Sequence, residues 1–160
     1  MIAKNDKIFL AGHNGMVGSA ILKKLKLRGY KKIITVSKSK LNLLDQKKVE
    51  IFLKKKKPKI VIIAAARVGG ILANNNNKAN FLYENLMIQT NLIHSSFLAG
   101  VKNLIFLGSS CIYPKNAKQP MKEKYFMTGK LEETNDAYAL AKITGVKLCK
   151  DYSKQYNLNY

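Results

Sequence analysis

An apolar run near the N-terminus leads directly into three evenly spaced glycines and then into a helical pattern. The run Lys7–Ala11 ends at Gly12, Gly15 and Gly18 follow, and an amphipathic stretch from about 16 to 28 ends at Gly29. Strand, glycine turn and helix in this order let the backbone approach a phosphate at the positive end of a helix. The spacing G-x-x-G-x-x-G differs from the commoner G-x-G-x-x-G, so the strand before it and the helix after it carry the interpretation. The sequence therefore predicts a dinucleotide-binding turn.

Three further apolar runs alternate with helical patterns along the chain. We predict strands at 32–36, 59–64 and 104–107, helices at 43–57, 81–98 and 136–155, a loop over the asparagine run 74–77, and a long polar connection at 115–135. Such alternation is typical of α/β folds with a parallel sheet. We expect a Rossmann-like doubly wound parallel sheet of about four strands in the order 3-2-1-4, within one domain spanning residues 1–160. A fifth strand would begin at 157–160.

Composition places limits on the class of protein. The chain has 160 residues and is 47% hydrophobic, which is enough for one core. It contains no run of eighteen apolar residues and no signal-peptide pattern at its start, so we expect no membrane span and a cytoplasmic location. Cys111 and Cys149 are its two cysteines, too few for a disulfide framework or a metal-ligand cluster. We therefore expect a reducing compartment and no metal.

The net charge of +20, from 29 lysines and arginines against 9 acidic residues, leaves a second class of function open. Such a charge attracts nucleic acid or anionic surfaces. Only Arg28 and Arg67 are arginines, however, and the lysines are spread along the chain. Nucleic-acid sites usually add arginine forks or a stacking aromatic platform, and neither is evident. A basic, non-catalytic nucleotide-binding module remains an alternative, but we expect no nucleic-acid partner.

The end of the second strand bears on the cofactor. An acidic residue there would bind the 2′-hydroxyl of an adenosine ribose, as NAD requires. The sequence offers Lys38 and Lys40, and no carboxylate before Asp45. Two ammonium groups suit a 2′-phosphate, so this pattern favours NADP over NAD.

The stretch from Leu107 to Lys142 carries the candidate chemistry. Ser109 and Cys111 follow the fourth strand, at the edge where open α/β sheets bind ligands. Tyr138 and Lys142 are four residues apart and share one face of a helix. A lysine ammonium beside the phenol would lower the pKa of the tyrosine, which could then exchange a proton with a carbonyl or alcohol oxygen near neutral pH. Ser109 could hydrogen-bond the same oxygen. His94 is expected to pack rather than to act as a base.

Together these motifs resemble the extended short-chain dehydrogenase/reductase superfamily, through Gly12-x-x-Gly15-x-x-Gly18, Gly108-Ser109-Ser110 and Tyr138-x-x-x-Lys142. Longer strings resemble one family in it, the GDP-L-fucose synthases. These strings are 11–18 (AGHNGMVG), 41–45 (LNLLD), 64–70 (AAARVGG), 107–114 (LGSSCIYP) and 117–121 (AKQPM).

The resemblance implies an NADPH-dependent 3,5-epimerase/4-reductase acting on a GDP-4-keto-6-deoxy sugar. Tyr138 would donate the proton to the C4 oxygen, Ser109 would hold that oxygen, Lys142 would bind the nicotinamide ribose, and Cys111 would be an epimerisation acid/base. The implied NADP(H) contacts are Gly12, His13, Asn14, Gly15, Met16, Val17, Gly18, Lys38, Ser39, Lys40, Leu41, Leu107, Gly108, Ser109, Ser110 and Lys142.

Two positions depart from the pattern of the family. Asn14 and Lys38 stand where the family often has arginine, and Lys38 keeps the charge but lacks the bidentate fork.

The family's sugar-nucleotide domain and partner histidine would lie beyond residue 160. We therefore expect an N-terminal half with little activity alone, and a homodimer for the full-length protein. Another nucleotide-sugar epimerase or dehydratase of the same superfamily is the nearest alternative.

Overall fold

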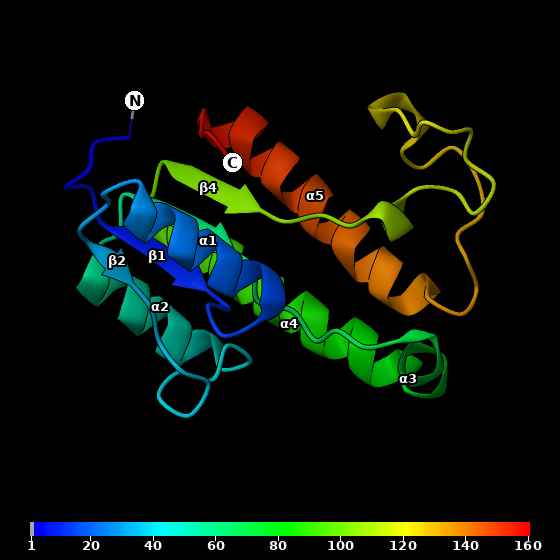
Figure 1. Cartoon of the computed structure of the whole chain (residues 1–160), viewed down its shortest axis with the longest axis horizontal. Helices are drawn as coiled ribbons and strands as arrows, with labels where there is room; N and C mark the ends of the chain where they lie inside the picture. The colour runs from blue at the N-terminus through cyan, green and yellow to red at the C-terminus, as the bar shows by residue number, and fades with distance from the viewer. Residues whose placement is uncertain (1) are drawn as a thin grey trace.

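A computed structural model describes residues 2–160. Helices cover both faces of a four-stranded, wholly parallel sheet (Figure 1). The elements in chain order are β1 (Ile8–Ala11), α1 (Met16–Leu27), β2 (Ile33–Ile34), α2 (Gln46–Lys56), β3 (Ile60–Ile63), α3 (Ile71–Asn76), α4 (Lys78–Leu98), β4 (Asn103–Phe106), the 3-10 turns η1 (Ser110–Ile112) and η2 (Glu123–Tyr125), and α5 (Asp136–Tyr156). The expected Rossmann-like α/β architecture is confirmed.

The strand order is β2-β1-β3-β4, which corrects the expected order 3-2-1-4. β3 pairs with β1 along its whole length, from Ile8 opposite Ile60 to Ala11 opposite Ile63. All four residues of β3 are buried, and a fully apolar strand requires neighbours on both edges and cover on both faces. The observed order gives β3 such an interior position and leaves the two-residue β2 at an edge. The chain adds β2 on one side of β1 and then β3 and β4 on the other side. The winding direction therefore reverses at the boundary between β1 and β3 in the sheet.

Alternate residues of the central strands face two separate cores. Ile8, Leu10, Ile60 and Ile62 pack on one side with Ile21, Leu22 and Leu25 of α1. Phe9, Ala11, Val61 and Ile63 face the other side, where the core includes Val49, Leu53, Leu92, Ile93 and Cys149 from α2, α4 and α5. The period of two along each strand thus fixes which helices cover which face.

Three elements differ from the sequence expectations or extend them. The second strand was expected over 32–36 but is limited to Ile33–Ile34. The asparagine run, expected as a loop, lies largely in α3, where Asn74 donates to the carbonyl oxygens of Gly69 (2.8 Å) and Gly70 (3.1 Å). At the C-terminus, Asn159 forms a parallel bridge with Asn103, where the fifth strand was expected to begin.

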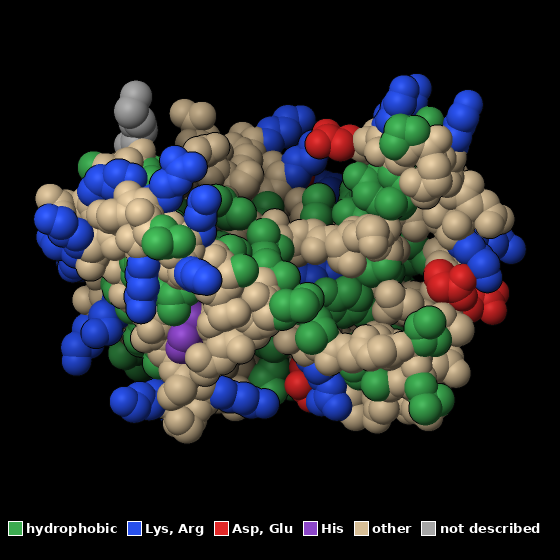
Figure 2. Space-filling view, viewed as in Figure 1, with side chains coloured by type: hydrophobic (Ala, Val, Ile, Leu, Met, Phe, Trp, Pro, Cys, Tyr) green, Lys and Arg blue, Asp and Glu red, His purple; other side chains and the backbone are tan. Residues whose placement is uncertain are grey.

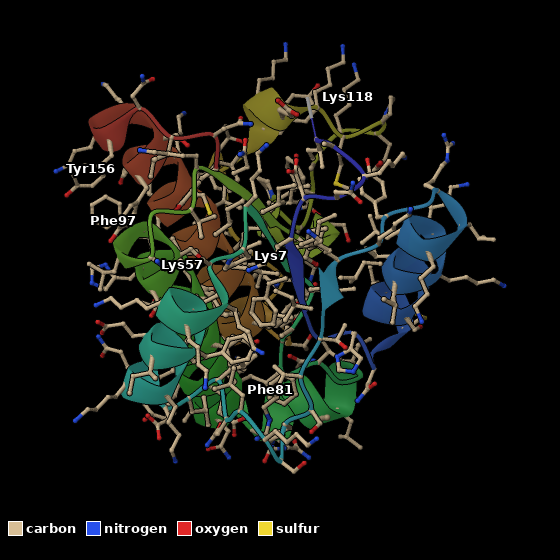
Figure 3. All side chains as sticks on the ribbon, turned by 90° about the vertical axis from the view of Figure 1, so that its left-hand side faces the viewer. Lys7, Lys57, Phe81, Phe97, Lys118 and Tyr156 are labelled. Carbon is tan, nitrogen blue, oxygen red and sulfur yellow. The ribbon has the colours of Figure 1, made fainter. Side chains whose placement is uncertain are left out.

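Lysines line the edge of the sheet at which the strands begin. Each strand directly follows a lysine, and the strand register aligns these four residues, which are Lys7, Lys32, Lys59 and Lys102. Lys54, Lys55 and Lys56 add charge from the last turn of α2, where cations stabilise the helix dipole. Figure 2 shows many basic side chains gathered over this end, and Figure 3, seen from that side, places Lys7 and Lys57 near its centre. Within residues 2–160, no helix has the length and hydropathy needed to span a membrane.

Candidate functional site

A cavity of about 640 Å³ opens at the carboxyl ends of β1 and β3. Its wall is formed by the turns after these strands and by the segment after β2, and comprises Phe9, Ala11–Gly12, His13–Gly18, Val36, Lys38, Leu41–Leu44, Ala64–Val68, Glu84 and Ile88. Its volume lies within the range of small-molecule sites. It also lies where the winding reverses, the position at which open α/β sheets bind ligands.

The fold requires glycine at two of the three glycine positions in the first turn, Gly12 and Gly18, but not at Gly15. Gly12 has φ +87°, and a Cβ there would lie 2.5 Å from the backbone nitrogen of Ala65. A Cβ on Gly18 would lie 2.0 Å from the carbonyl oxygen of Gly12. Both distances are far shorter than any real Cβ contact, so the fold itself requires these two glycines. At Gly15 the nearest atom would be 3.5 Å away, an ordinary contact, so the fold leaves room there.

Helix α1 begins at this turn without a side-chain cap. Gly15 is its N-cap residue, and the first turn contains no acidic residue. The free N–H groups of a first helical turn, together with the helix dipole, attract an anion. His13 adds a buried ring nitrogen, Nδ1, which lacks a hydrogen-bond partner among the described residues. Met16, the first residue of α1, also belongs to the wall and is 88% exposed.

The segment after β2 brings two of the expected cofactor residues to the cavity. Lys38 and Leu41 belong to its wall, and Leu41 is buried. The turn is closed by the amides of Lys40 and Leu41, which donate to the carbonyl oxygen of Ser37. Ser39 is exposed and its hydroxyl lies 3.0 Å from that of Ser37, while Lys40 is exposed and is not part of the cavity wall. Of the two lysines, the structure thus brings Lys38 to the cavity.

Polar residues of α4, which were not predicted as site residues, hold the cavity wall after β3 and after β2. Asn85 accepts from the backbone N–H of Arg67 (2.8 Å) and donates to the Arg67 carbonyl oxygen (3.0 Å). The Arg67 guanidinium pairs with Glu84. On the same helix, Asn91 is buried and donates to the Leu43 carbonyl oxygen (2.9 Å). The signal in the sequence was asparagine on the apolar face of a long helix, because a buried amide needs partners.

The second cluster of expected residues lies on η1 and α5, at the same carboxyl edge. The Cys111 thiol donates to the Ser109 hydroxyl at 3.1 Å, and the Cys111 amide lies 3.5 Å from the same oxygen. Lys142 is 4% exposed, and its ammonium donates to the Leu107 carbonyl oxygen at 2.8 Å. The Lys142 nitrogen lies 5.8 Å from the centre of the Tyr138 ring. Gly108 and Ser110 are exposed beside this cluster.

The expected lowering of the Tyr138 pKa is wrong for this structure. Burial raises the pKa of the phenol, and the nearby Cys111 adds to the effect. The same burial lowers the pKa of Lys142 from 10.5 to about 8, against a smaller opposite effect of Cys111. The Lys142 ammonium bonds to a backbone oxygen instead of the phenol, so its attraction does not offset the loss of solvent around Tyr138. Near pH 7 the phenol is protonated and is therefore poised to donate.

Contacts to α4 hold the N-terminal half of α5. Lys78 forms an ion pair with Asp136 at 3.0 Å and donates to the Glu133 carbonyl oxygen at 2.5 Å. Gln89 is buried and donates to the Ala141 carbonyl oxygen at 2.5 Å. These contacts fix the helix that carries Tyr138 and Lys142.

His94 lies in an aromatic cluster, as expected for a packing residue. Its Nδ1 is 2.6 Å from the Tyr152 hydroxyl. Phe97 stacks on Tyr156 with ring centres 4.3 Å apart, and Figure 3 shows these two side chains next to each other. The residues 2–160 contain no group of three or more His, Cys, Asp or Glu side chains arranged to hold a metal.

Known proteins resemble this chain in sequence and in fold. GDP-L-fucose synthase of Escherichia coli (strain K12) is 50% identical over 155 residues, which are 97% of this chain and 48% of that protein. Putative GDP-L-fucose synthase 2 of Arabidopsis thaliana is 53% identical over 156 residues, covering 98% and 48%. The solved structure of MlghC, a GDP-mannoheptose C4 reductase from Campylobacter jejuni with NADP bound, matches with a TM-score of 0.95 and 42% identity over 99% of this chain and 50% of that one.

The chain spans about half the length of the curated relatives that it matches. The model of the NAD dependent epimerase/dehydratase family matches residues 8–160. The chain therefore belongs to the NAD dependent epimerase/dehydratase family.

Proposed function

We propose that this chain is the cofactor-binding and catalytic Ser/Tyr/Lys half of an NADPH-dependent nucleotide-sugar epimerase/reductase. The observation that carries the proposal is the clustering of Ser109, Cys111, Tyr138 and Lys142 at the same sheet edge as a glycine-walled cavity. A hydroxyl, a thiol, a phenol and an ammonium are the groups needed to move protons around a ketone.

The residues present fit NADP(H). Gly15 has no side chain at the start of an uncapped helix, and this suits a pyrophosphate. Lys38 supplies a cation on the wall for a 2′-phosphate, and no carboxylate precedes Asp45 on this segment. Lys142 would bind the nicotinamide ribose. The other proposed contacts are Gly12, His13, Asn14, Met16, Val17, Gly18, Ser39, Lys40, Leu41, Leu107, Gly108, Ser109 and Ser110.

The side chains of this chain would divide the chemistry. NADPH, when bound, supplies the hydride for a C4 ketone. Ser109 hydrogen-bonds the ketone oxygen, and Tyr138, kept protonated by its raised pKa, gives that oxygen a proton. Lys142 holds its charge beside the phenol and compensates the negative charge that the phenol acquires. Cys111, in contact with Ser109, exchanges protons on the carbons beside the ketone.

The proposed substrate is GDP-4-keto-6-deoxy-D-mannose and the product GDP-L-fucose. The names of the two relatives at 50% and 53% identity support this choice. Because the chain covers 48% of each of these proteins, the complete protein would add the sugar-nucleotide domain and the second acid/base. We propose a homodimer for the complete protein and a cytoplasmic location.

Titration of the chain with NADPH and NADH tests the cofactor half of this proposal. We expect saturable binding, tighter for NADPH, and little conversion of the keto sugar by the 160 residues alone. Full turnover of the keto sugar by this chain alone would contradict the proposal that the complete protein needs a further sugar-nucleotide domain. If duplex DNA bound better than NADPH and both complexes dissociated as salt rose, the chain would instead be a basic binding module.

A reductase that does not epimerise is the second candidate, favoured by the 42% identity to a GDP-mannoheptose C4 reductase. Turnover of the complete protein in D₂O separates the two. Deuterium entering both carbons that flank the ketone, and lost in the Cys111→Ala variant, would support the epimerase. Reduction without deuterium exchange would support the simple reductase.

A further inference from the structure

The ring of Phe106 lies against α5, close to both the ammonium of Lys142 and the backbone at Gly145. The Lys142 nitrogen is 4.5 Å from the centre of the ring. A Cβ at Gly145, three residues further along α5, would lie 2.5 Å from the ring Cζ and 2.6 Å from Cε1. Phe106 is the last residue of β4 and comes directly before Leu107, whose carbonyl oxygen accepts from the same ammonium. One short segment therefore contacts the lysine twice, through a carbonyl oxygen and through an aromatic face.

We propose that Phe106 is a positioning residue for Lys142. We also propose that Gly145, which has no side chain, leaves the room on α5 that allows the ring to pack against the ammonium. The proposal rests on the proposed function in one respect: the lysine so positioned is the one expected to bind the cofactor ribose. The contacts themselves belong to this chain alone.

The surroundings of Lys142 explain why an aromatic face is useful there. A buried ammonium is costly unless its charge finds compensation. Among the described residues, the titratable groups near it are Cys111 from η1 and Tyr138 from its own helix. A carboxylate would hold the lysine in a salt bridge, whereas the negative face of a ring attracts the cation and leaves its N–H groups available.

Gly145 is unexplained by the helix in which it occurs. α5 has 21 residues, and glycine in the interior of a helix is less favourable than alanine. A Cβ at this position would also lie 2.9 Å from Oε1 of Gln89, the residue that donates to Ala141. The missing side chain thus makes room for the two groups, Phe106 and Gln89, that hold the catalytic part of α5.

The pKa of Lys142 in the chain without cofactor tests this proposal. It is measured by NMR titration of the lysine side-chain carbons, with the Lys142 signal assigned by its loss in Lys142→Arg. Phe106→Leu keeps an apolar side chain but removes the ring, so the pKa of Lys142 should fall by roughly half to one pKa unit. Phe106→Tyr keeps an aromatic ring and should leave the pKa of Lys142 at its wild-type value. An unchanged or raised pKa in Phe106→Leu overturns the proposal.

A double-mutant comparison tests whether Gly145 makes room for the ring of Phe106. Gly145→Ala should displace the ring and lower the pKa of Lys142 when Phe106 is present. In the Phe106→Leu background its effect should be much smaller, because the clash with the ring is gone and only the 2.9 Å contact with Oε1 of Gln89 remains. Equal shifts in both backgrounds would show that Gly145 acts without the ring and would overturn this part. Phe97→Leu is the matched control, since this ring packs in the His94 cluster, and it should leave the pKa unchanged.

NADPH titration of the same variants separates this proposal from the proposed function. Weakened NADPH binding in Phe106→Leu together with a lowered pKa supports both. A lowered pKa in a chain that does not bind NADPH leaves the positioning role standing and rejects the cofactor. Normal NADPH binding with an unmoved pKa rejects the positioning role alone.

Discussion

The carbonyl oxygen of Gly12 occupies the space into which any side chain on Gly18 would project, 2.0 Å from the position of a Cβ. The backbone at Gly18 therefore packs directly against the turn that precedes α1. This contact fixes where the helix begins, and hence where its free N–H groups point.

Gly18→Ala should destabilise the fold. The added methyl meets backbone atoms that cannot turn aside, and we expect a loss of about 1–3 kcal/mol or more in the free energy of unfolding, measured by urea denaturation. Gly70→Ala is the matched control, because nothing lies within 4 Å of a Cβ there and the residue is the N-cap of α3. It should cost less than about 0.5 kcal/mol. Equal losses in the two variants would contradict the close-packing account.

Gly15→Ala should separate binding from folding. A Cβ there makes only an ordinary 3.5 Å contact, and the backbone angles of φ −76° and ψ 166° suit any residue. We expect a loss of stability no larger than about 0.5 kcal/mol, as for the N-cap glycine Gly70, and an NADPH affinity at least about tenfold weaker, since the methyl would occupy space near the pyrophosphate. Wild-type affinity in the variant, measured by calorimetric titration, would place the pyrophosphate elsewhere.

Lys38→Gln should weaken NADPH binding more than NADH binding. Lys38 lies on the cavity wall, and the loss of one charged partner of a phosphate should reduce NADPH affinity about tenfold while NADH affinity changes little. Lys40→Gln removes an exposed lysine two residues away and serves as the control. If Lys40→Gln had the larger effect, the 2′-phosphate would lie against the outer side of the turn.

The buried Lys142 should make the stability of the fold depend on pH. Its pKa is about 8 in the folded chain, below its ordinary value of 10.5, so the unfolded chain binds more protons between these values and stability rises with pH across this window. The full effect is on the order of 3 kcal/mol. Cys149, whose pKa burial raises from 9.0 to about 12, acts in the opposite direction above pH 9.

The difference between wild type and Lys142→Met isolates the lysine. Unfolding free energies measured from pH 7 to pH 10 should rise more steeply for the wild type. Only the wild type has a buried ammonium, and its unfavourable burial ends when Lys142 loses its proton in the folded chain. Parallel curves for the two proteins would mean that Lys142 titrates in the folded chain as it does in water.

Much of the architecture follows from local patterns. The runs at β1 and β3 are apolar over their length, β4 is apolar after Asn103, and Gly29, with φ +77°, ends the first helix as its position predicted. The order of the strands does not follow from such patterns, because it depends on which strand can be covered on both faces. The asparagine run was missed because Asn74 and Asn77 donate to nearby backbone carbonyl oxygens, an outcome that intrinsic propensity does not express.

The candidate site was predictable in its parts but not in its electrostatics. Spacing alone placed Tyr138 and Lys142 on one helical face, and topology placed Ser109 and Cys111 at the same edge. The sequence could not show that Lys142 would bond to Leu107, nor that burial would raise the pKa of Tyr138. It also gave no sign that Phe106 and Gly145 would fit against each other, because 39 positions separate them and the contact depends on how α5 packs on β4.

A crystal structure of the chain with NADPH tests the central claim most directly. We predict the pyrophosphate over Gly15 at the start of α1, the 2′-phosphate at Lys38, and the nicotinamide ring beside the Tyr138 hydroxyl, with Lys142 on its ribose. A nicotinamide ring turned away from Ser109 and Tyr138, or NADPH bound among the lysines at the opposite edge of the sheet, would contradict the account.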